Sequence, residues 1–356
     1  MSDKGRGGAR VFLAFFLCLL FVCAYIYRIR EERGDGMNVR SRESLAMDTI
    51  IRVSLHSCKT PEELERILDG TFALIASLDS ELSMFKPSSG IALVNASSGQ
   101  APVKVSRETS RAVSASLALF RLTGGAFDPT IGPVTALWRI GDAKNPRLRL
   151  PDNREIEEAL ALVGADMATV SPDDRVYLSR AGMKIDLGGI AKGFVSAEAG
   201  NFLAAAGVES ALIDLGGNVL TVGSRPNGTP WKIGIQHPYR QRGEPICSIE
   251  VSGAAVITAG VYERYVEIDG KRYPHIFDPH TGRPVEGDLL SVTVVSEDPT
   301  AGDALSTAFM ALGLEKSKEL LESLPGVEAI FVSKGTGAEP ELYATVGIKG
   351  LTRIAR

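Results

Sequence analysis

Residues 184–207 read KIDLGGIAKGFVSAEAGNFLAAAG, and this stretch decides what kind of fold the sequence predicts. It starts as the end of a β-strand, turns at Gly188 and Gly189, and continues as a helix. A glycine turn before a helix exposes backbone N–H groups, which bind anions, and Lys192 adds a positive charge on the first helical turn. The competing interpretation is the nucleotide-binding turn of a Rossmann domain, but the glycine spacing does not fit, and the segment lies far from the N-terminus.

The rest of the chain mixes the same two kinds of element. Short alternating runs predict strands at residues 50–55, 211–214 and 292–295. Amphipathic stretches predict helices at residues 61–82, 106–123, 191–207 and 302–324. The first of these helices has Thr60 as a cap and Pro61 in its first turn. The pattern predicts an α+β fold whose folded part runs from residue 44 to residue 356.

The composition excludes several classes of protein. With 44% hydrophobic residues among 356, the chain can form a packed core, so disorder is not its main state. The net charge is −4 and the charges are interspersed, so we expect no nucleic-acid partner. The sequence contains no P-loop, HExxH, GxSxG or GxGxxG signature. The chemistry must therefore depend on other residues.

The four cysteines do not form a disulfide framework. Cys18 and Cys23 lie in an apolar N-terminal run, which leaves Cys58 and Cys247 in the remaining chain. Because no Cys and His cluster has zinc spacing, the sequence predicts no structural zinc site. Whether Cys58 and Cys247 pair is left open by the sequence.

The uncharged N-terminal run indicates where the protein works. Residues 11–27 read VFLAFFLCLLFVCAYIY and follow the basic stretch 1–10. As a helix this run rises about 26 Å, a little less than the hydrocarbon core of about 30 Å, so it can span a membrane. We expect residues 1–10 in the cytoplasm, 11–27 as a single-pass transmembrane signal anchor, and 28–43 as a linker. The domain at 44–356 would then lie on the periplasmic side of the cytoplasmic membrane.

Two alternatives to the anchor remain. A cleaved signal peptide would have small residues before the cut, whereas this run ends in Tyr-Ile-Tyr, so we favour an uncleaved anchor and leave cleavage open. A lipoprotein would have small residues before its lipidated cysteine, which neither Cys18 nor Cys23 has. Arg28, Arg30 and Arg33 follow the run, so positive charge flanks both of its ends and does not fix the orientation.

Two segments contain side chains suited to binding and proton transfer. GGAFDPTIGP (124–133) opens with two glycines and contains two prolines, which suits a rigid binding loop, although a turn with buried Phe127 would explain the same composition. In YPHIFDPHTGRPV (273–285), a strand carrying His275 runs into a tight turn at Asp278 and Pro279. Imidazole titrates near neutral pH, so His275 is the candidate proton acceptor. A lone histidine at a strand end can equally be structural.

GDALSTAFMALG (302–313) places a carboxylate and a hydroxyl one turn apart at the beginning of a helix. Asp303 and Thr307 are four residues apart, hence on one face. Both are hard oxygen donors, which Mg²⁺ binds together with carbonyls, waters and phosphate. The alternative is that Asp303 complements its own helix N-terminus and Thr307 bonds back to a carbonyl. Only the first interpretation predicts dependence on a metal.

Five segments in this order resemble the FAD:protein FMN transferase family, also called ApbE-like flavin transferases. They read LAMDTIIRVSL (45–55), GGAFDPTIGPVTALWRIG (124–141), KIDLGGIAKGFVSAEAGNFLAAAG (184–207), VITAGVYERYVEIDGKRYPHIFDPHTGRPV (256–285) and GDALSTAFMALG (302–313). The resemblance covers nearly everything from residue 45 onward. It implies a single large catalytic domain of the family's T-fold-like α+β type.

The resemblance also implies the flavin-binding residues. Met47 would line the flavin site, although Asp48 stands beside it where the family usually has glycine. Phe85 would pack on the isoalloxazine, at a position where the family often has tyrosine. With FAD as the ligand, Lys192 would meet the diphosphate and Asp186 would accept a hydrogen bond from a ribose or ring group. The other implied contacts to FAD are Ala126, Phe127 and Asp128, largely through main chain, and His275.

The implied activity is a Mg²⁺-dependent transfer of FMN. Mg²⁺ would be held by Asp303, Thr307 and the carbonyl of Gly189. A Thr or Ser hydroxyl of a partner protein would attack the FMN-side phosphorus of FAD, AMP would leave, and His275 would take the proton. The implied partners are exported domains of membrane redox complexes. Two alternatives stay open, an FAD pyrophosphatase that releases FMN and AMP, and a non-catalytic flavin-binding protein.

Overall fold

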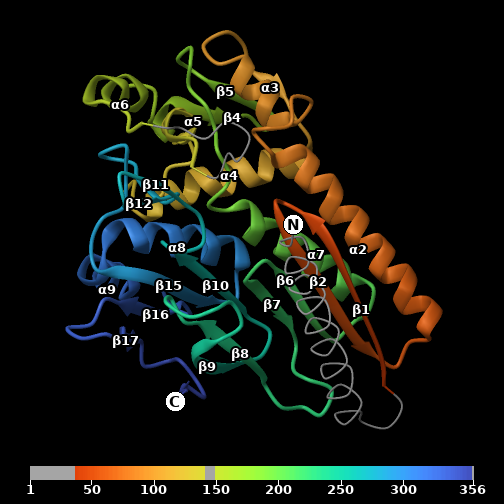
Figure 1. Ribbon diagram of the computed structural model, residues 1–356. Helices are drawn as coiled ribbons and strands as arrows, with labels where there is room; N and C mark the ends of the chain where they lie inside the picture. The colour runs from red at the N-terminus through yellow and green to blue at the C-terminus, as the bar shows by residue number, and fades with distance from the viewer. Residues whose placement is uncertain (1–36, 141–148, 355–356) are drawn as a thin grey trace, which may run out of the picture.

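An eight-stranded antiparallel sheet runs through the centre of the molecule (Figure 1). The computed structural model describes residues 37–140 and 149–354. The strands, in sheet order, are β1 (Asn38–Ala46), β2 (Thr49–Ser57), β6 (Ser210–Leu215), β7 (Asn218–Val222), β10 (Ala255–Gly260), β15 (Leu289–Ser296), β16 (Glu328–Ser333) and β17 (Glu341–Ala344). The predicted strands at 50–55, 211–214 and 292–295 lie within β2, β6 and β15. Helices pack on one face, so the α+β prediction is confirmed.

The edge strand β1 corrects one predicted boundary. It begins at Asn38, so the predicted linker at 28–43 is wrong for its last six residues, and the folded part begins before residue 44. β1 is an edge strand, and edge strands commonly carry charged side chains, which prevent pairing with another chain. Arg42 pairs with Glu65 and Asp69 of the neighbouring helix, at 2.9 and 2.7 Å. Polarity here therefore indicates a paired surface and not a linker.

Helix α2 (Pro61–Leu82) begins and ends where the sequence predicts. Thr60 accepts a hydrogen bond from the Glu63 N–H at 3.3 Å, and the Glu63 carboxylate accepts one from the Thr60 N–H at 2.7 Å. This reciprocal capping box satisfies two donors that a helix start otherwise leaves free. Its buried side chains recur at helical spacing along one stripe, which includes Leu64, Leu68, Ile75, Leu78 and Leu82.

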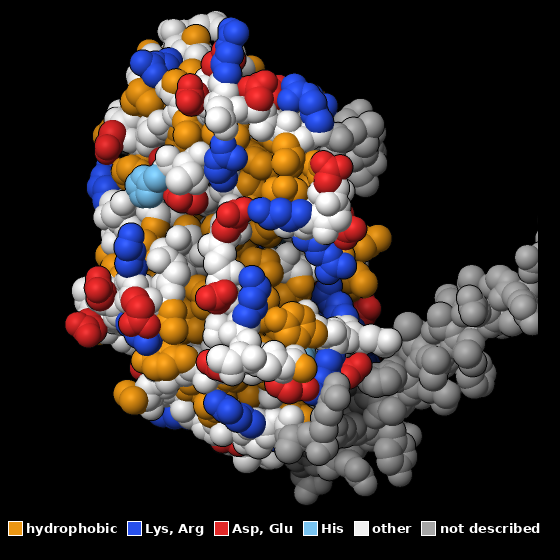
Figure 2. Space-filling model, turned by 60° about the vertical axis from the view of Figure 1, so that its left-hand side comes forward, with side chains coloured by type: hydrophobic (Ala, Val, Ile, Leu, Met, Phe, Trp, Pro, Cys, Tyr) orange, Lys and Arg blue, Asp and Glu red, His pale blue; other side chains and the backbone are white. Residues whose placement is uncertain are grey.

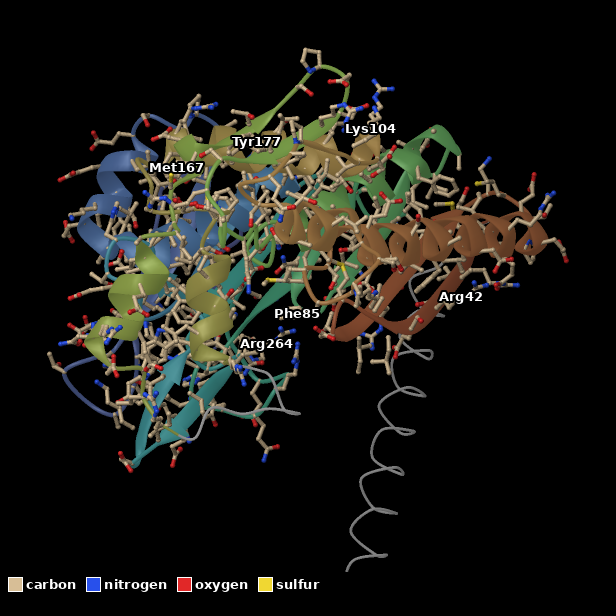
Figure 3. The ribbon with its side chains drawn as sticks, turned by 90° about the horizontal axis from the view of Figure 1, so that it is seen from above. Arg42, Phe85, Lys104, Met167, Tyr177 and Arg264 are labelled. Atoms are coloured by element: carbon tan, nitrogen blue, oxygen red, sulfur yellow. The ribbon has the colours of Figure 1, made fainter. Side chains whose placement is uncertain are left out.

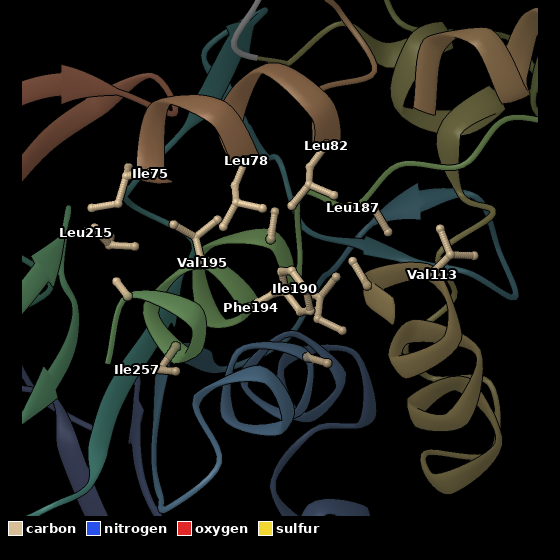
Figure 4. Close-up of a cluster of buried hydrophobic side chains, with 14 of the residues drawn as sticks. Ile75, Leu78, Leu82, Val113, Leu187, Ile190, Phe194, Val195, Leu215 and Ile257 are labelled. Atoms are coloured by element: carbon tan, nitrogen blue, oxygen red, sulfur yellow. The ribbon is translucent and has the colours of Figure 1, made fainter. Parts of the chain in front are cut away.

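That stripe packs on α7 (Ala191–Ala205), the helix of the stretch at 184–207. Figure 4 shows Ile75, Leu78 and Leu82 facing the side chains around the start of α7, with Leu215 and Ile257 of the sheet at the left of the view. The α7 side of the contact consists of Leu187, Ile190, Phe194 and Val195. Each fully buried side chain of this size contributes about 1.5–3 kcal/mol. The start of α7 is therefore fixed from several sides.

The predicted helix at 302–324 is two helices. Helix α8 spans Pro299–Leu312 and α9 spans Leu314–Leu321. Between them Gly313 has φ +78°, a conformation that glycine adopts without steric cost and that ends a helix. The apolar pattern continues across the break, which is why periodicity alone predicts one long helix. The start of α8 is capped by Asp298, which accepts from the N–H groups of Thr300 and Ala301.

The remaining elements lie at one end of the large sheet and on the face that α2 and α7 leave free. The upper end in Figure 1 carries most of the other helices, a small sheet and two short hairpins. The helices are α3 (Gly90–Ala96), α4 (Arg107–Leu122), α5 (Gly132–Trp138), α6 (Asn153–Leu160) and the 3₁₀ turn η1 (Ala165–Met167). The small sheet is β3 (Val103–Lys104), β5 (Arg175–Leu178) and β4 (Ala168–Val170), and the hairpins are β11 (Tyr265–Ile268) with β12 (Lys271–Pro274) and β13 (Phe277–Asp278) with β14 (Arg283–Pro284).

A second small sheet packs on the face of the large sheet opposite to α2 and α7. It consists of β18 (Thr352–Arg353), β9 (Pro245–Val251) and β8 (Trp231–Gln236). Its Ile233, Cys247 and Ile249 pack against Val256 and Ile330 of the large sheet. Figure 2 shows acidic and basic side chains mixed over one face of the molecule.

The predictions for the N-terminus concern residues that the structure does not describe. Residues 1–10 and the predicted anchor at 11–27 lie outside the described ranges. Within 37–140 and 149–354, none of the helices has the length and apolar character needed to cross a bilayer. Cys58 is exposed and Cys247 is buried, and both are free thiols.

Candidate active site

The start of α7 is capped by a side chain of another helix. Its N-cap residue, Ile190, makes no side-chain capping bond. Instead, the N–H of Gly193 donates to Oδ2 of Asp303 on α8 at 2.8 Å. A Cβ atom at Gly193 would collide with the carbonyl of Pro299, so only glycine allows the two helices to approach this closely. Asp303 is therefore placed at the positive end of the α7 dipole.

The second oxygen of Asp303 is also held. Asn218, at the start of β7, donates from Nδ2 to Oδ1 at 2.9 Å, and both side chains are buried. The alternative that Asp303 complements its own helix is wrong, because Asp298 caps α8. Each carboxylate oxygen can accept more than one bond, so one donor on each leaves acceptor capacity for a cation.

Thr307 and Gly189 complete the predicted metal-binding group. A Cβ atom at Gly189 would lie 3.2 Å from Oγ1 of Thr307 and 3.1 Å from the ring of Phe127, so these three residues are in contact. Among the described residues, the Thr307 hydroxyl makes no hydrogen bond, so the alternative that it bonds back to a carbonyl is wrong. No backbone N–H of the described chain donates to the Gly189 carbonyl, because that of Gly193 is turned to Asp303.

This donor set fits Mg²⁺. It combines one carboxylate, one hydroxyl and one carbonyl, all hard oxygen donors, and two of them lack a protein partner. Within the described ranges no group of three or more His, Cys, Asp or Glu side chains is arranged to hold a metal. The charge for a cation therefore comes from Asp303 alone, and substrate phosphate and water would supply the other ligands.

The loop at 126–130 is closed by its own hydrogen bonds. The buried carboxylate of Asp128 accepts from the N–H and hydroxyl of Thr130, at 2.7 and 2.6 Å, and burial raises the pKa of this carboxyl. The N–H of Phe127 donates to the hydroxyl of Thr123 at 3.1 Å. The side chain of Asp128 thus builds the turn, as the structural alternative predicts, while Ala126 and Phe127 are buried. What the loop can offer a ligand is mainly its backbone.

Asp186 lies beside that loop. Its N–H donates to the carbonyl of Pro129 at 2.8 Å, and its Oδ1 accepts from the Gly188 N–H at 2.8 Å. Oδ2 makes no hydrogen bond with the described residues. Asp186 therefore brings a carboxylate with a free oxygen to the junction between the loop and the turn that starts α7.

His275 lies between β12 and β13 and is tied to one carbonyl. Its backbone N–H and its Nδ1 are each 3.1 Å from the carbonyl of Arg264. A carbonyl can only accept, so Nδ1 carries the proton and Nε2 is free to act as a base. Burial, followed by the nearby charge of Lys192, lowers the pKa of His275 from 6.5 to about 4. The ring is therefore neutral at pH 7, and Lys192 forms no ion pair with any described residue.

The turn after His275 is rigid, as the sequence predicts. Asp278 accepts from the N–H of His280 at 2.9 Å and from the hydroxyl of Thr281 at 3.1 Å. Gly282 has φ +63°, and its carbonyl accepts from the indole N–H of Trp138 at 2.9 Å. The ring of His280 lies against Gly125, where a Cβ atom would be 3.4 Å from it. The turn and the loop that follows Gly125 are therefore adjacent.

Met47 and Phe85 lie on segments other than those that carry Asp303, Lys192 and His275. Met47 and Asp48 form the two-residue turn between β1 and β2, with φ of 52° and 56°. Asp48 thus keeps the conformation for which glycine is favoured. Phe85 follows α2, and 76% of it is exposed. Figure 3 shows Phe85 and Arg264 on the same side of the molecule. No hydrogen bond or ring contact among the described residues joins Met47 or Phe85 to the other predicted residues.

Three residues of the site carried no individual prediction. Asn218 and Gly193 hold Asp303, and the carbonyl of Arg264 holds His275. The two glycines before Asn218 mark a turn, which is the one sequence signal near it. A backbone carbonyl acts regardless of its side chain, so no residue type could reveal the role of Arg264.

Comparison with known proteins gives a consistent result. A model of the ApbE family matches residues 47–331. An FAD:protein FMN transferase of Treponema pallidum is 35% identical over 96% of this chain and 94% of its own length. An FAD:protein FMN transferase of Klebsiella pneumoniae is 38% identical over 76% of this chain and 83% of its own length.

Solved structures show the same similarity. The ApbE protein of Thermotoga maritima has a TM-score of 0.78 and 32% identity, and the match covers 87% of this chain and 97% of that one. The flavin transferase ApbE of Vibrio cholerae has a TM-score of 0.77 and 26% identity, with 87% of this chain and 98% of that one covered. The similarity therefore extends over nearly the whole described domain.

Proposed function

Because the chain belongs to the ApbE family and is an FAD:protein FMN transferase, we propose that the residues gathered at the start of α7 are its active site. The observation that carries this proposal is the convergence of Asp303, Thr307 and the Gly189 carbonyl, two of which lack a protein partner. The unpaired charge of Lys192, three residues after Gly189, lies close enough to the neutral ring of His275 to lower its pKa.

The reaction that we propose forms one P–O bond and breaks another. The oxygen of a Thr or Ser hydroxyl on the acceptor protein attacks the FMN-side phosphorus of FAD. The bond from that phosphorus to the AMP oxygen breaks, and AMP leaves. Nε2 of His275 takes the hydroxyl proton, because the Arg264 carbonyl keeps Nδ1 protonated and burial keeps the ring neutral.

The remaining predicted residues hold the substrate. Lys192, in the first turn of α7, places its ammonium group near the diphosphate. The N–H groups of Gly189 and Lys192, which have no acceptor among the described residues, add to it. Asp303, Thr307 and the Gly189 carbonyl would hold Mg²⁺, which would supply charge neutralisation on the diphosphate. The backbone of the loop at 126–128 and the free oxygen of Asp186 bind the rest of FAD.

Met47 and Phe85 contact the flavin ring in this proposal. The role of Met47 rests on the family motif, because its positive φ is what a two-residue hairpin turn requires. Phe85 is supported by its exposure, because a bound aromatic ring would cover an apolar side chain that otherwise faces water.

We further propose that the protein works outside the cytoplasm, held by residues 11–27 as a transmembrane anchor. The acceptor would be an exported domain of a membrane redox complex. The uncharged run after a basic stretch supports the anchor. A reporter fused after Arg356 tests it, because the anchor predicts a membrane-bound, periplasmic signal, whereas a cytoplasmic signal would contradict the orientation.

Incubation of the protein with FAD, Mg²⁺ and an acceptor domain tests the reaction. We expect covalent flavin fluorescence on the acceptor and release of AMP, both abolished by EDTA and restored by Mg²⁺. Replacement of the acceptor hydroxyl by alanine should remove the label. Release of FMN and AMP at the same rate with and without the acceptor, and with no label, would instead indicate an FAD pyrophosphatase.

A further inference from the structure

A cavity of about 250 Å³ lies at the end of the molecule away from His275. It is bounded by the segment between β8 and β9, the residues that lead into β17, and β18. In Figure 1 these strands lie at the bottom, near the C-terminus, whereas β11 and β12 lie near the top. Its polar lining consists of His237, Arg240, Glu339 and Arg353.

His237 offers a hydrogen-bond donor to this cavity. The residue is 3% exposed, and its Nδ1 accepts from the N–H of Tyr239 at 3.1 Å. A nitrogen that accepts carries no proton, so the proton of the neutral ring is on Nε2. Nε2 lies 3.4 Å from Oε2 of Glu339. A buried imidazole thus presents N–H to the cavity even when it is uncharged.

Arg240 adds a mostly buried positive charge. Its side chain is 16% exposed, and its Nε is buried without a hydrogen-bond partner among the described residues. Its Nη2 lies 3.5 Å from the same Oε2 of Glu339. A buried guanidinium with an unused donor is unfavourable unless an acceptor reaches it. Arg353 brings a second guanidinium, of which Nη2 donates to the Leu342 carbonyl at 3.1 Å.

Glu339 only partly satisfies these donors. Both of its contacts, at 3.4 and 3.5 Å, exceed the roughly 2.7–2.9 Å that is typical of a charge-assisted hydrogen bond. Its side chain is 64% exposed, so it can move into solvent without losing a buried position. Two guanidinium groups and one carboxylate leave the cavity with an excess of one positive charge before His237 is counted.

We propose that this cavity is a second binding site, for a small oxyanion such as a carboxylate or phosphate group, which replaces Glu339 against His237 and Arg240. The volume is below the roughly 300–1,000 Å³ of typical small-molecule sites, so it suits a few heavy atoms and excludes a dinucleotide such as FAD. The site is therefore distinct from the flavin site, and it does not depend on the proposed mechanism.

Titration of the full chain with inorganic phosphate, at ionic strength held constant with NaCl, tests this proposal. Calorimetry and thermal melting should both show saturable binding. Arg240→Gln should weaken it at least about tenfold, because a charged hydrogen bond is lost. Glu339→Gln should strengthen it, because the competing carboxylate is removed. A purely structural ion pair predicts the opposite for Glu339→Gln, namely a lower melting temperature and no response to phosphate.

Further variants separate this site from the flavin site and from folding effects. Lys192→Met removes a cation of the flavin site and leaves the second cavity unchanged. Phosphate binding at the second cavity, which Arg240→Gln should weaken, should therefore persist in Lys192→Met. If Arg240→Gln fails to fold, Arg353→Gln gives the same test from the edge of the cavity. A titration with acetate in place of phosphate shows whether the site binds a carboxylate or a phosphate group. Saturable binding of either anion supports the proposed site. Absence of saturable binding of both anions to the wild type and to Glu339→Gln would overturn the proposal, as would binding that Lys192→Met alone removes.

Discussion

Asp303 and His275 belong to the same candidate active site but are supported in different ways. Asp303 is buried where α7 and α8 meet, and each of its oxygens has a protein donor. His275 lies between two short hairpins and is tied through one carbonyl. The metal-binding part is therefore fixed by side-chain hydrogen bonds between core elements, whereas the base makes one hydrogen bond and its neighbours Ile276 and Phe277 supply the packing. Changes to the first should alter stability and activity together, and changes to the second should alter activity alone.

Replacement of His275 should give the largest effect on rate. We expect His275→Asn to lower kcat of FMN transfer by about 10²–10⁴-fold, the range for a general base, while the Kd for FAD changes little. The free energy of unfolding should change by no more than about 0.5 kcal/mol, because asparagine keeps an N–H donor for the Arg264 carbonyl. Transfer kinetics and FAD titration check this, with His280→Asn as the matched control. Equal losses in rate and FAD affinity would show that His275 positions FAD instead.

Removal of the Asn218 donor should lower both the stability of the protein and its affinity for Mg²⁺. Asn218→Ala leaves Oδ1 of the buried Asp303 without its donor, which should cost about 1.5–3 kcal/mol in unfolding free energy. It should also weaken Mg²⁺ by about 10–100-fold, as loss of a residue that orients a metal ligand does. Thr60→Ala removes the α2 cap and should cost about 0.5–2 kcal/mol with no change in the Mg²⁺ titration. Equal Mg²⁺ titrations for both variants would separate Asn218 from the metal.

The pH dependence should reflect the neutral state of His275. Its pKa of about 4 in the folded protein is below the ordinary 6.5, so the base stays deprotonated down to about pH 4. The acid limb of kcat/KM for FAD should therefore fall near pH 4 and not near 6.5. Stability should decrease as pH falls from 6.5 towards 4, because the unfolded state then binds the proton first. NMR titration of the ring checks the assignment, and an inflection near 6.5 would contradict it.

A neighbouring charge contributes less to this shift than burial does. Lys192→Met should raise the pKa of His275, because a nearby positive charge disfavours a second one, yet the pKa should stay below 6.5 because burial remains the larger cause. The same NMR titration on the free protein measures it. An unchanged pKa would mean that the ammonium group of Lys192 lies too far from the ring to act on the same substrate atoms.

The smallest expected effect concerns two hairpin turns. Met47 and Asp48 both have positive φ, as do Asp269 and Gly270, but only the second pair places glycine second. Asp48→Gly should stabilise the protein by up to about 1 kcal/mol, and Gly270→Asp should destabilise it by a similar amount. Urea unfolding of both variants measures this. A loss of stability in Asp48→Gly would show that the aspartate side chain holds the turn.

Local signals account for the parts of the fold that the sequence predicts well. Thr60 and Pro61 mark the start of α2, and the apolar alternation marks β2, β6 and β15, because caps and periodicity depend on near neighbours. The predicted element boundaries are wrong where contacts with residues distant in the sequence, or the backbone conformation, determine the structure. Arg42 in β1 is paired by α2, so a polar strand resembles a linker, and Gly313 ends α8 through its backbone conformation while the apolar pattern continues.

The same distinction applies to the site. Spacing alone places Asp303 and Thr307 on one helix face, and the motif around His275 predicts the rigid turn that the structure has. The role of Gly189 as a metal ligand is predicted from the family resemblance alone, because every residue type has a backbone carbonyl. That Asp303 caps α7, 110 positions from Gly193, could not be predicted, because it depends on how two helices pack.

The Mg²⁺ dependence of FMN transfer in Asp303→Asn tests the central claim most directly. Asparagine keeps an oxygen to accept from Gly193, but its NH2 group would face the Nδ2 donor of Asn218, so the protein should fold with a lower melting temperature. Because the one negative charge assigned to the ion is removed, transfer should fall by more than about 100-fold at millimolar Mg²⁺. Thr307→Val should weaken Mg²⁺ less, because water can replace a neutral ligand. Thermal melts of each variant provide the control. Transfer by Asp303→Asn at the wild-type rate and the same Mg²⁺ concentration would contradict the proposed site.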